Sequence, residues 1–179
     1  MPKNPRPTEA QMEAWRAFLM SSRSVRATLE HELHQERHLS MPAYEVLLRL
    51  WGAPHRRLRM LDLARATQLS RNGLSQLVGR MEAAGLVQRC GAVDDGRGTV
   101  CSLTGTGVRA FKRAAVVHVR GIREHFAVHF TDEEARQLTA LLRRVLEDRD
   151  GPPSAPGAHP SCGEGSDSSD GLQADVAEL

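Results

Sequence analysis

The chain has 179 residues, of which 40% are hydrophobic, 26% charged and 4% aromatic, and its formal net charge is +2. This composition is ordinary for one globular domain with or without a tail. No apolar run is long enough to span a membrane and no secretory signal is visible, which argues against a membrane protein and favours a cytoplasmic one. The three cysteines, Cys90, Cys101 and Cys162, are too few for a disulfide scaffold, as expected in a reducing compartment.

The charge is distributed unevenly along the chain. All 24 basic residues precede residue 150, whereas six of the 22 acidic residues follow Arg149, so residues 1–149 carry a net charge of about +8. A basic globular part with an acidic tail is typical of a polyanion binder. Residues 150–179, rich in Gly, Pro, Ser, Ala and Asp, predict a disordered acidic tail, and the Pro-rich residues 1–7 predict a flexible N-terminus.

Two helices are predicted before the central stretch of the chain. The first spans residues 8–38, and Thr8 is suited to cap its N-terminus. Its apolar stripe must be buried against another surface; it consists of Trp15, Phe18, Leu19, Val25, Leu29 and Leu33. The second helix opens at Ser40–Pro42 and ends at Gly52–Pro54. Its inward-facing residues are Tyr44, Val46, Leu47, Leu48, Leu50 and Trp51.

The stretch 60–103 begins with two short helices joined by a tight turn. Helical spacing predicts one buried face, made of Leu61, Ala64, Leu69, Leu74, Leu77, Val78 and Met81. Ser70 stands where an N-cap is expected and Gly85 where a left-handed C-terminal residue is expected. The second helix of the pair is therefore predicted to run from about Arg71 to Ala84.

The outer face of that second helix carries only hydrogen-bonding side chains: Ser70, Arg71, Asn72, Ser75, Gln76 and Arg80. Arg, Asn and Gln can each make two hydrogen bonds to a guanine or adenine edge, and Ser and Arg near a helix N-terminus suit phosphate. An ordinary solvated helix face would carry mixed Glu and Lys, which are absent between Ser70 and Met81. The pattern favours a DNA-binding helix.

A β-hairpin is predicted next, with strands at 86–92 and 99–103 around the turn sequence 94–98. A hairpin after a recognition helix is a wing, and Arg97 at its tip is expected to enter a minor groove. Asp95 is expected to support Arg97 through a charge-assisted hydrogen bond. The alternative is a surface ion pair of little energetic value.

Two more helices follow the hairpin. Thr104 is predicted to cap one at 105–129, and the sequence Thr131–Glu134 is a capping box for one that ends near Arg149. Their apolar positions are Val108, Phe111, Val116, Val119, Ile122, Phe126, Leu138, Leu141, Leu142, Val145 and Leu146. A small central domain cannot cover all these stripes, which leaves either a dimer interface or an intramolecular bundle.

These motifs resemble the MarR family of winged-helix transcriptional regulators over about residues 9–147. The resemblance is carried by Leu61-x-x-Ala64, Leu69-Ser70-Arg71-x-Gly73-Leu74, Leu77-Val78-x-Arg80-Met81-Glu82-x-x-Gly85-Leu86-Val87, Asp95-x-Arg97-Gly98 and Leu103-Thr104-x-x-Gly107. It implies a mainly α fold with a small β-hairpin wing, namely a winged helix-turn-helix lobe plus a helical dimerisation region. The implied units are a flexible N-terminus (1–7), a dimerisation helix (8–38), the DNA-binding domain (39–104), two dimerisation helices (105–149) and the tail (150–179).

The resemblance further implies a homodimer on a pseudo-palindromic double-stranded DNA operator. It also implies a small aromatic or anionic effector bound between the dimer helices and the DNA-binding lobe, with Arg23 or Arg26 as anion partner. Candidate pocket residues are Trp15, Phe18, Tyr44, Leu48, Trp51 and Phe111, for each of which plain core packing is the alternative.

Other chemistry is weakly supported. His31, His34 and His38, like His125 and His129, have spacings that could ligate zinc, but basic residues surround them and we expect no metal. If the hairpin is symmetric about Asp95–Gly96, Cys90 and Cys101 lie opposite each other, which allows a strained and reducible disulfide. No phosphate loop, nucleophile elbow or metalloprotease motif occurs, so we expect neither an enzyme nor a cofactor.

The sequence therefore predicts a homodimeric, sequence-specific transcriptional regulator, most simply a repressor released by a small molecule. One alternative is a redox-responsive regulator of the same fold using Cys90 and Cys101. Another is an architectural winged-helix protein that binds DNA without sequence preference.

Overall fold

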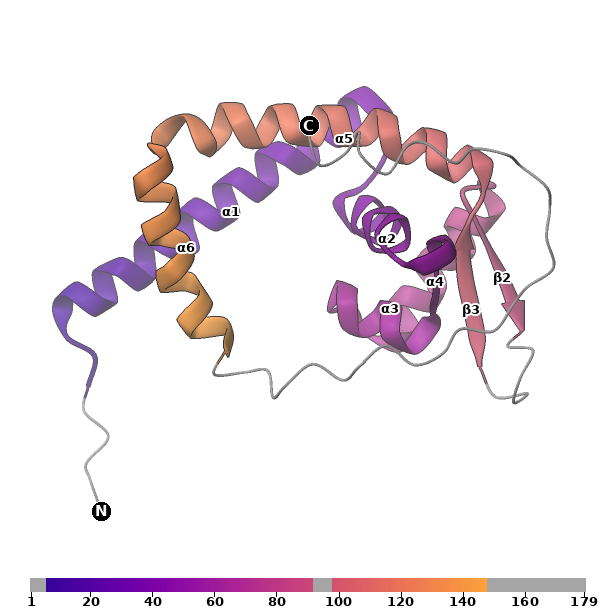
Figure 1. The fold of residues 1–179 in the computed structure, drawn as a ribbon, viewed down its shortest axis with the longest axis horizontal. Coiled ribbons are helices and arrows are strands. Elements are labelled where there is room, and N and C mark those ends of the chain that lie inside the picture. Colours follow the sequence, from indigo (N-terminus) through magenta and orange to yellow (C-terminus); the bar gives the residue numbers. More distant parts are fainter. Residues whose placement is uncertain (1–5, 92–97, 148–179) are drawn as a thin grey trace, which may run out of the picture.

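The computed structural model describes residues 6–91 and 98–147, which form six α-helices, two short 3₁₀ turns and three strands within that part (Figure 1). In chain order they are α1 (Glu9–Arg37), α2 (Met41–Trp51), η1 (Pro54–Arg56), β1 (Arg57–Arg59), α3 (Met60–Thr67), α4 (Arg71–Ala83), β2 (Val87–Gly91), β3 (Thr99–Leu103), α5 (Gly105–His125), η2 (Ala127–His129) and α6 (Asp132–Glu147). The arrangement is the predicted one, mainly α with a small winged sheet.

Figure 1 shows two regions joined by the long helix α5. On one side, α2, α3, α4 and the sheet form a lobe beneath the N-terminal part of α5. On the other side, α1 runs beside α5 and extends away from the lobe, and α6 turns back at the far end of α5. Polar side chains link the two long helices: Glu36 of α1 forms an ion pair with Arg120 of α5, and the Glu32 carboxylate lies within hydrogen-bonding distance, 2.6 Å, of Nε2 of His125.

The helix starts follow local capping chemistry, as predicted. The Thr8 and Ser40 hydroxyls cap α1 and α2, and Thr8 forms a reciprocal capping box with Gln11. Thr104 accepts from the backbone N–H of Gly107, and Thr131 forms the predicted box with Glu134. One end differs from expectation: α5 stops at His125 instead of 129, because the backbone of Phe126 (φ −134°, ψ −62°) leaves the helical region and a 3₁₀ turn follows.

The sheet contains a strand that the sequence did not predict. β1 is only three residues long and pairs antiparallel with β3, which also pairs with β2, giving the order β1-β3-β2.

The hairpin register corrects one expectation. Cys90 lies opposite Val100, and Cys101 lies opposite Arg89, one residue away from the symmetric pairing that we assumed. Because neighbouring strand residues point to opposite faces, Cys101 is buried on one face while Cys90 lies on the other. The expected side-by-side thiol pair was wrong, and with it the geometric basis of the redox alternative.

The core lies under α5 and around α2. Its largest fully buried side chains are Phe111, Leu33, Leu47, Leu50, Leu63, Leu74, Val46, Val78, Val87, Val117 and Cys101. Two residues expected inside, Leu48 and Leu61, are exposed instead. In α3 the helix turns Leu63 inward, and Leu61 is 41% exposed at the edge of the lobe.

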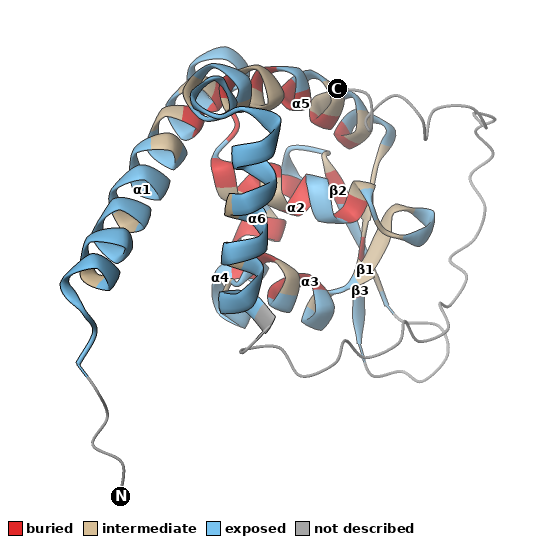
Figure 2. Cartoon of the chain, turned by 60° about the vertical axis from the view of Figure 1, so that its left-hand side comes forward, coloured by how far each residue is buried: buried red, intermediate tan, exposed pale blue. Residues whose placement is uncertain are grey.

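Helices α1 and α6 carry exposed apolar side chains, and Figure 2 shows most of both helices in the colour of exposed residues. In α1 the buried residues are Leu29 and Leu33, near its C-terminus, whereas Trp15 is 53% and Met20 73% exposed. In α6 no residue with described exposure is buried, and Val145 is 65% exposed. None of the described helices is long and apolar enough to cross a membrane.

Candidate nucleic-acid interface

Helix α4 presents one apolar and one polar face. Its N-terminus is capped by the Ser70 hydroxyl, which accepts a hydrogen bond from the Gly73 backbone N–H at 3.1 Å. Leu74, Leu77, Val78 and Met81 are buried and fix the helix against the lobe. The side chains of the opposite face are all exposed, and they are those of Arg71, Asn72, Ser75, Gln76 and Arg80.

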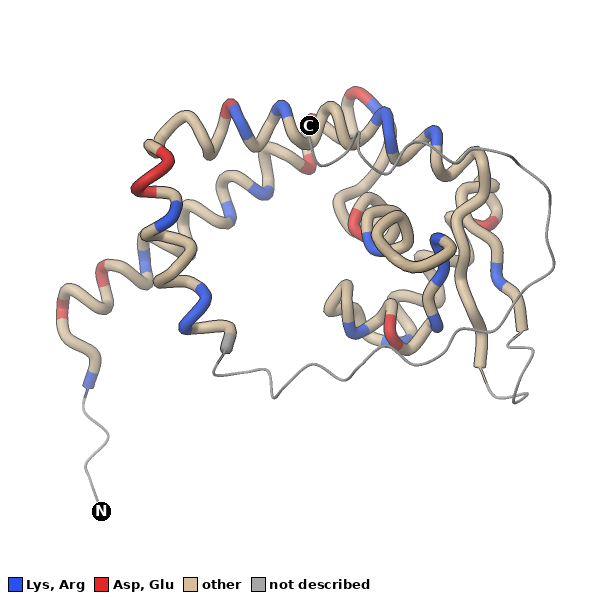
Figure 3. Tube along the Cα trace, viewed as in Figure 1, with Lys and Arg blue, Asp and Glu red and all other residues tan. Residues whose placement is uncertain are grey.

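The charges around this face are mostly positive. The first turn of α4 holds no acidic residue. Figure 3 shows arginine positions along the lower side of the lobe, on α3 and α4, with one acidic position between them. That acid is Asp62, whose carboxylate lies 3.7 Å from Arg65 on the same helix. A basic surface with multivalent donors is chemically suited to a polyanion that also presents hydrogen-bonding edges.

The wing is tied to α4 by one arginine. The backbone N–H and the Nε–H of Arg89 in β2 donate to the two carboxylate oxygens of Glu82 in α4, each at 2.8 Å. These bonds hold the pKa of Glu82 below its usual range, chiefly through the backbone donor. The hairpin therefore keeps a defined position relative to the polar face of α4. The wing tip, including Asp95 and Arg97, lies outside the described residues.

A hollow of about 400 Å³ lies between α3, α4 and the hairpin. Its lining residues are Arg59, Met60, Leu61, Arg71, Leu74, Ser75, Arg89, Gly98 and Thr99. Arg71 and Ser75 were predicted from the sequence as DNA contacts, whereas Arg59 and Arg89, which line the same hollow, were not singled out. The one signal that could have revealed them is an arginine on each short strand flanking the helix pair.

Comparisons with known proteins agree with this arrangement. The sequence model of the MarR family matches residues 39–98. AbsC, a MarR family transcriptional regulator from Streptomyces coelicolor, is 34% identical over 81% of this chain and 97% of its own, with a TM-score of 0.75. This chain belongs to the MarR family. Family membership makes it a transcriptional regulator and not an enzyme.

Two further structures resemble this MarR family chain. Sco3205, a MarR family regulator from the same organism whose structure contains DNA, is 28% identical over 85% of this chain and 95% of its own, with a TM-score of 0.79. BpsR from Bordetella bronchiseptica, whose DNA binding is regulated by 6-hydroxynicotinic acid, is 16% identical over 75% of this chain and 99% of its own. Its TM-score of 0.66 shows likeness of fold. A comparison with curated proteins found no match.

The structure divides the candidate pocket residues of this MarR chain into two groups. The rings of Tyr44, Trp51 and Phe111 stack together in the core, with centroid distances of 5.9 Å (Tyr44–Phe111) and 5.3 Å (Trp51–Phe111). Burial raises the pKa of Tyr44 to about 12. Trp15 and Phe18 pair with each other, 6.1 Å apart, on the exposed part of α1. Leu48 is exposed on α2, so one protomer does not bring all six together.

The histidine spacings singled out in the sequence do not gather ligands. The rings of His34 and His38 meet edge to face at 6.4 Å, and His125 is engaged with Glu32. Among residues 6–91 and 98–147, no cluster of three or more His, Cys, Asp or Glu side chains could hold a metal ion.

Proposed function

We propose that this MarR family regulator is a homodimer that binds a pseudo-palindromic DNA operator with sequence specificity and represses transcription until a small-molecule effector releases it. The observation that carries the proposal is the polar face of α4, fully exposed on a helix that is anchored by four buried apolar side chains. The DNA-bound structure of Sco3205, at 28% identity, supports the same use of this fold.

The roles within α4 follow from side-chain chemistry. Asn72, Gln76 and Arg80 can each make two hydrogen bonds to a base edge in the major groove, which gives sequence discrimination. Ser70 and Arg71, at the helix N-terminus, suit phosphate contacts that fix the register of the helix. From the sequence alone, Arg97 remains assigned to the minor groove and Asp95 to its support.

The dimer is proposed from the uncovered apolar side chains at both ends of the chain. Trp15 and Phe18 of α1 and Val145 of α6 are exposed in the protomer, and burying them in water-excluding contact with a second copy is favourable at about 25 cal/mol per Å². We accordingly assign residues 8–38 and 105–149 to dimerisation and residues 39–104 to DNA binding. Two recognition helices related by a dyad imply half-sites about 10 bp apart.

The effector is proposed to be a small aromatic or anionic molecule, by likeness to BpsR and its 6-hydroxynicotinic acid. Arg23 and Arg26 are both exposed on α1. Arg26 is held by Glu45 of α2 at 3.0 Å, so an anion there would compete for this ion pair. Such competition would couple the effector to the contact between α1 and the DNA-binding lobe.

Selection of bound sequences from a random DNA pool tests the proposal. A recovered consensus with dyad symmetry is expected, and Asn72→Ala should relax the preference at particular positions of it. Gln35→Ala, on the exposed surface of α1, is the matched control and should leave the consensus unchanged. Equal affinity of the wild-type protein for all sequences would instead indicate an architectural DNA-binding protein.

Sedimentation tests the dimer separately. Val145→Glu should shift the protein toward monomer at micromolar concentration, whereas Thr139→Glu places the same charge near Arg136 and Arg143 on another face of α6 and should not. A wild-type protein that sediments as a monomer would contradict the homodimer.

A further inference from the structure

The hollow between α3, α4 and the hairpin lies on the same surface as the proposed DNA-reading face, because Arg71 and Ser75 belong to both. Three arginines from three different elements line it: Arg59 at the end of β1, Arg71 at the start of α4 and Arg89 in β2. Within the part of the chain that the structure describes, no acidic residue lines the hollow. Three arginines that lie at separate positions in the sequence thus line one opening.

Arg89 is oriented by bonds outside the hollow. Glu82 accepts from its backbone N–H and from Nε, which fixes the plane of the guanidinium group. Nη2 of Arg89 lies beside Gly79, where a Cβ would come within 3.6 Å of it. An arginine bound through Nε keeps its terminal N–H donors for a second acceptor, and the planar fork matches phosphate oxygens.

The apolar part of the lining identifies the kind of anion. Met60 is half-buried and Leu61 is 41% exposed beside the arginines, although both stand in a segment whose periodicity predicted core positions. A DNA backbone alternates an anionic phosphate with an apolar deoxyribose, so it presents the same pair of chemistries as this opening. A fully hydrated inorganic anion would gain nothing from an exposed leucine.

We propose that this hollow receives one phosphate of the DNA backbone, with Arg59, Arg71 and Arg89 as charge-assisted donors and Leu61 against the neighbouring sugar. The inference rests on the proposed function, since it places DNA along α4. The phosphate contact carries no sequence information; it sets the depth and register at which α4 enters the groove. Glu82 is then a positioning residue, because it acts on DNA only through Arg89.

The decisive experiment is a methylphosphonate scan of the selected operator, which neutralises one phosphate at a time. With wild-type protein, one phosphate per half-site should stand out, with affinity lowered roughly 10- to 100-fold as for a missing charge-assisted hydrogen bond. With Arg59→Gln, native DNA should already bind more weakly, and methylphosphonate at that same position should cost less affinity than it costs the wild-type protein, because only Arg71 and Arg89 then remain as donors. The salt dependence, d log K/d log[salt], should become less steep by about 0.9 for each phosphate that the variant no longer neutralises.

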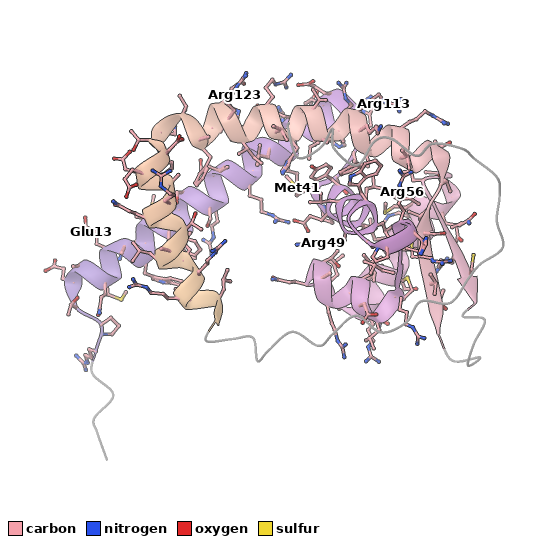
Figure 4. The ribbon with its side chains drawn as sticks, viewed as in Figure 1. Glu13, Met41, Arg49, Arg56, Arg113 and Arg123 are labelled. Atoms are coloured by element: carbon pink, nitrogen blue, oxygen red, sulfur yellow. The ribbon has the colours of Figure 1, made fainter. Side chains whose placement is uncertain are left out.

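The matched control is Arg113→Gln, which removes the same charge from the exposed side of α5, away from the hollow (Figure 4). This variant should show the same sensitive phosphate in the methylphosphonate scan, and the same salt dependence of DNA affinity, as the wild-type protein. Thermal unfolding of each variant checks that the fold is intact, and Arg59→Lys offers a second variant that keeps the charge but loses the planar fork.

Three outcomes would overturn the inference. If wild-type protein binds the operator but Arg59→Gln shows the same loss of affinity at that phosphate and the same salt slope as wild type, the hollow does not hold DNA backbone and the proposed function stands. If the scan is flat and inorganic phosphate weakens DNA binding more than chloride of equal ionic strength, the hollow is a site for a free anion. If wild-type protein selects no DNA at all, both this inference and the proposed function fail.

Discussion

Replacing Gly107 with alanine should destabilise the protein strongly, because this residue has no room for a side chain. Gly107 is buried in the first turn of α5, and a Cβ there would overlap the backbone carbonyl oxygen of Leu86 and lie 3.0 Å from Cδ2 of Leu103. The same carbonyl accepts from the Thr104 backbone N–H at 3.2 Å. The Thr104 hydroxyl in turn lies 2.6 Å from the carbonyl oxygen of Gly85. The first turn of α5 is therefore tied directly to the turn that ends α4.

The expected size of the effect can be built from these contacts. Forcing a methyl group against a fixed backbone carbonyl costs about 1–3 kcal/mol as overpacking, because neither the helix nor the turn is free to shift. Moving α5 far enough to admit it would also weaken the Thr104 hydrogen bonds to Leu86 and Gly85, at about 0.5–1.5 kcal/mol each. The higher helix propensity of alanine offsets roughly 0.5–1 kcal/mol of this loss in the free energy of unfolding. The net loss should be about 2–4 kcal/mol, which lowers Tm by roughly 5–15 °C for a domain of this size.

Thermal and urea unfolding of Gly107→Ala measure this loss, and Gly105→Ala is the matched control. Gly105 is exposed in the same turn, and its nearest neighbour would be Nη1 of Arg109 at 3.7 Å. The control should be as stable as wild type or slightly more stable. Equal stability of the two variants would refute the close packing of α5 on the turn after α4.

Three further results are expected. Gln76→Ala should lose about 1–3 kcal/mol of discrimination at particular operator positions, and an equal loss on random DNA would show that it does not read bases. The pKa of the Glu82 carboxyl is lower in the folded protein than its usual 4.5. Its contribution to the free energy of unfolding is therefore fully present above pH 4.5 and is lost as the pH falls through the folded pKa. Glu82→Gln should make the free energy of unfolding less dependent on pH in this acidic range. Burial raises the pKa of Cys101 to about 12, so iodoacetamide at pH 8 should modify this thiol only when the chain unfolds; peptide mapping separates it from Cys90 and Cys162, and rapid labelling of Cys101 itself in the native protein would contradict its burial.

The helices could be predicted because their starts depend on local chemistry. Ser70, Thr104 and Thr131 each accept from a backbone N–H three residues ahead, and such caps are visible in a short window of sequence. The third strand could not be predicted in this way, since β1 has only three residues and exists through pairing with Val100–Ser102, more than forty residues away. The register of the β2–β3 hairpin could not be predicted either, because assuming a symmetric turn gave a pairing that differs by one residue from the observed one.

The candidate site was predictable to a similar degree. The polar face of α4 follows from helical periodicity, so the exposure of Asn72 and Gln76 could be anticipated. Arg59 and Arg89 could not be assigned, because their approach to Arg71 requires the tertiary placement of two strands around α4. The prediction that Leu61 is buried was wrong for the same reason. The helical spacing of apolar residues in such a short helix is compatible with either face being buried, and in the tertiary structure Leu63 is the buried residue.

The unbroken length of α5 has a mechanical consequence. Its 21 residues span about 32 Å at 1.5 Å per residue, with one end hydrogen-bonded to the turn after α4 and the other hydrogen-bonded to α1 through His125 and Glu32. A rigid rod of this length acts as a lever, so a tilt of about 5° at the α1 end displaces the opposite end by roughly 3 Å. That displacement approaches the spacing of about 3.4 Å between successive base pairs. In the proposed DNA complex, a tilt of this size among the long helices would be enough to move α4 out of register with the groove.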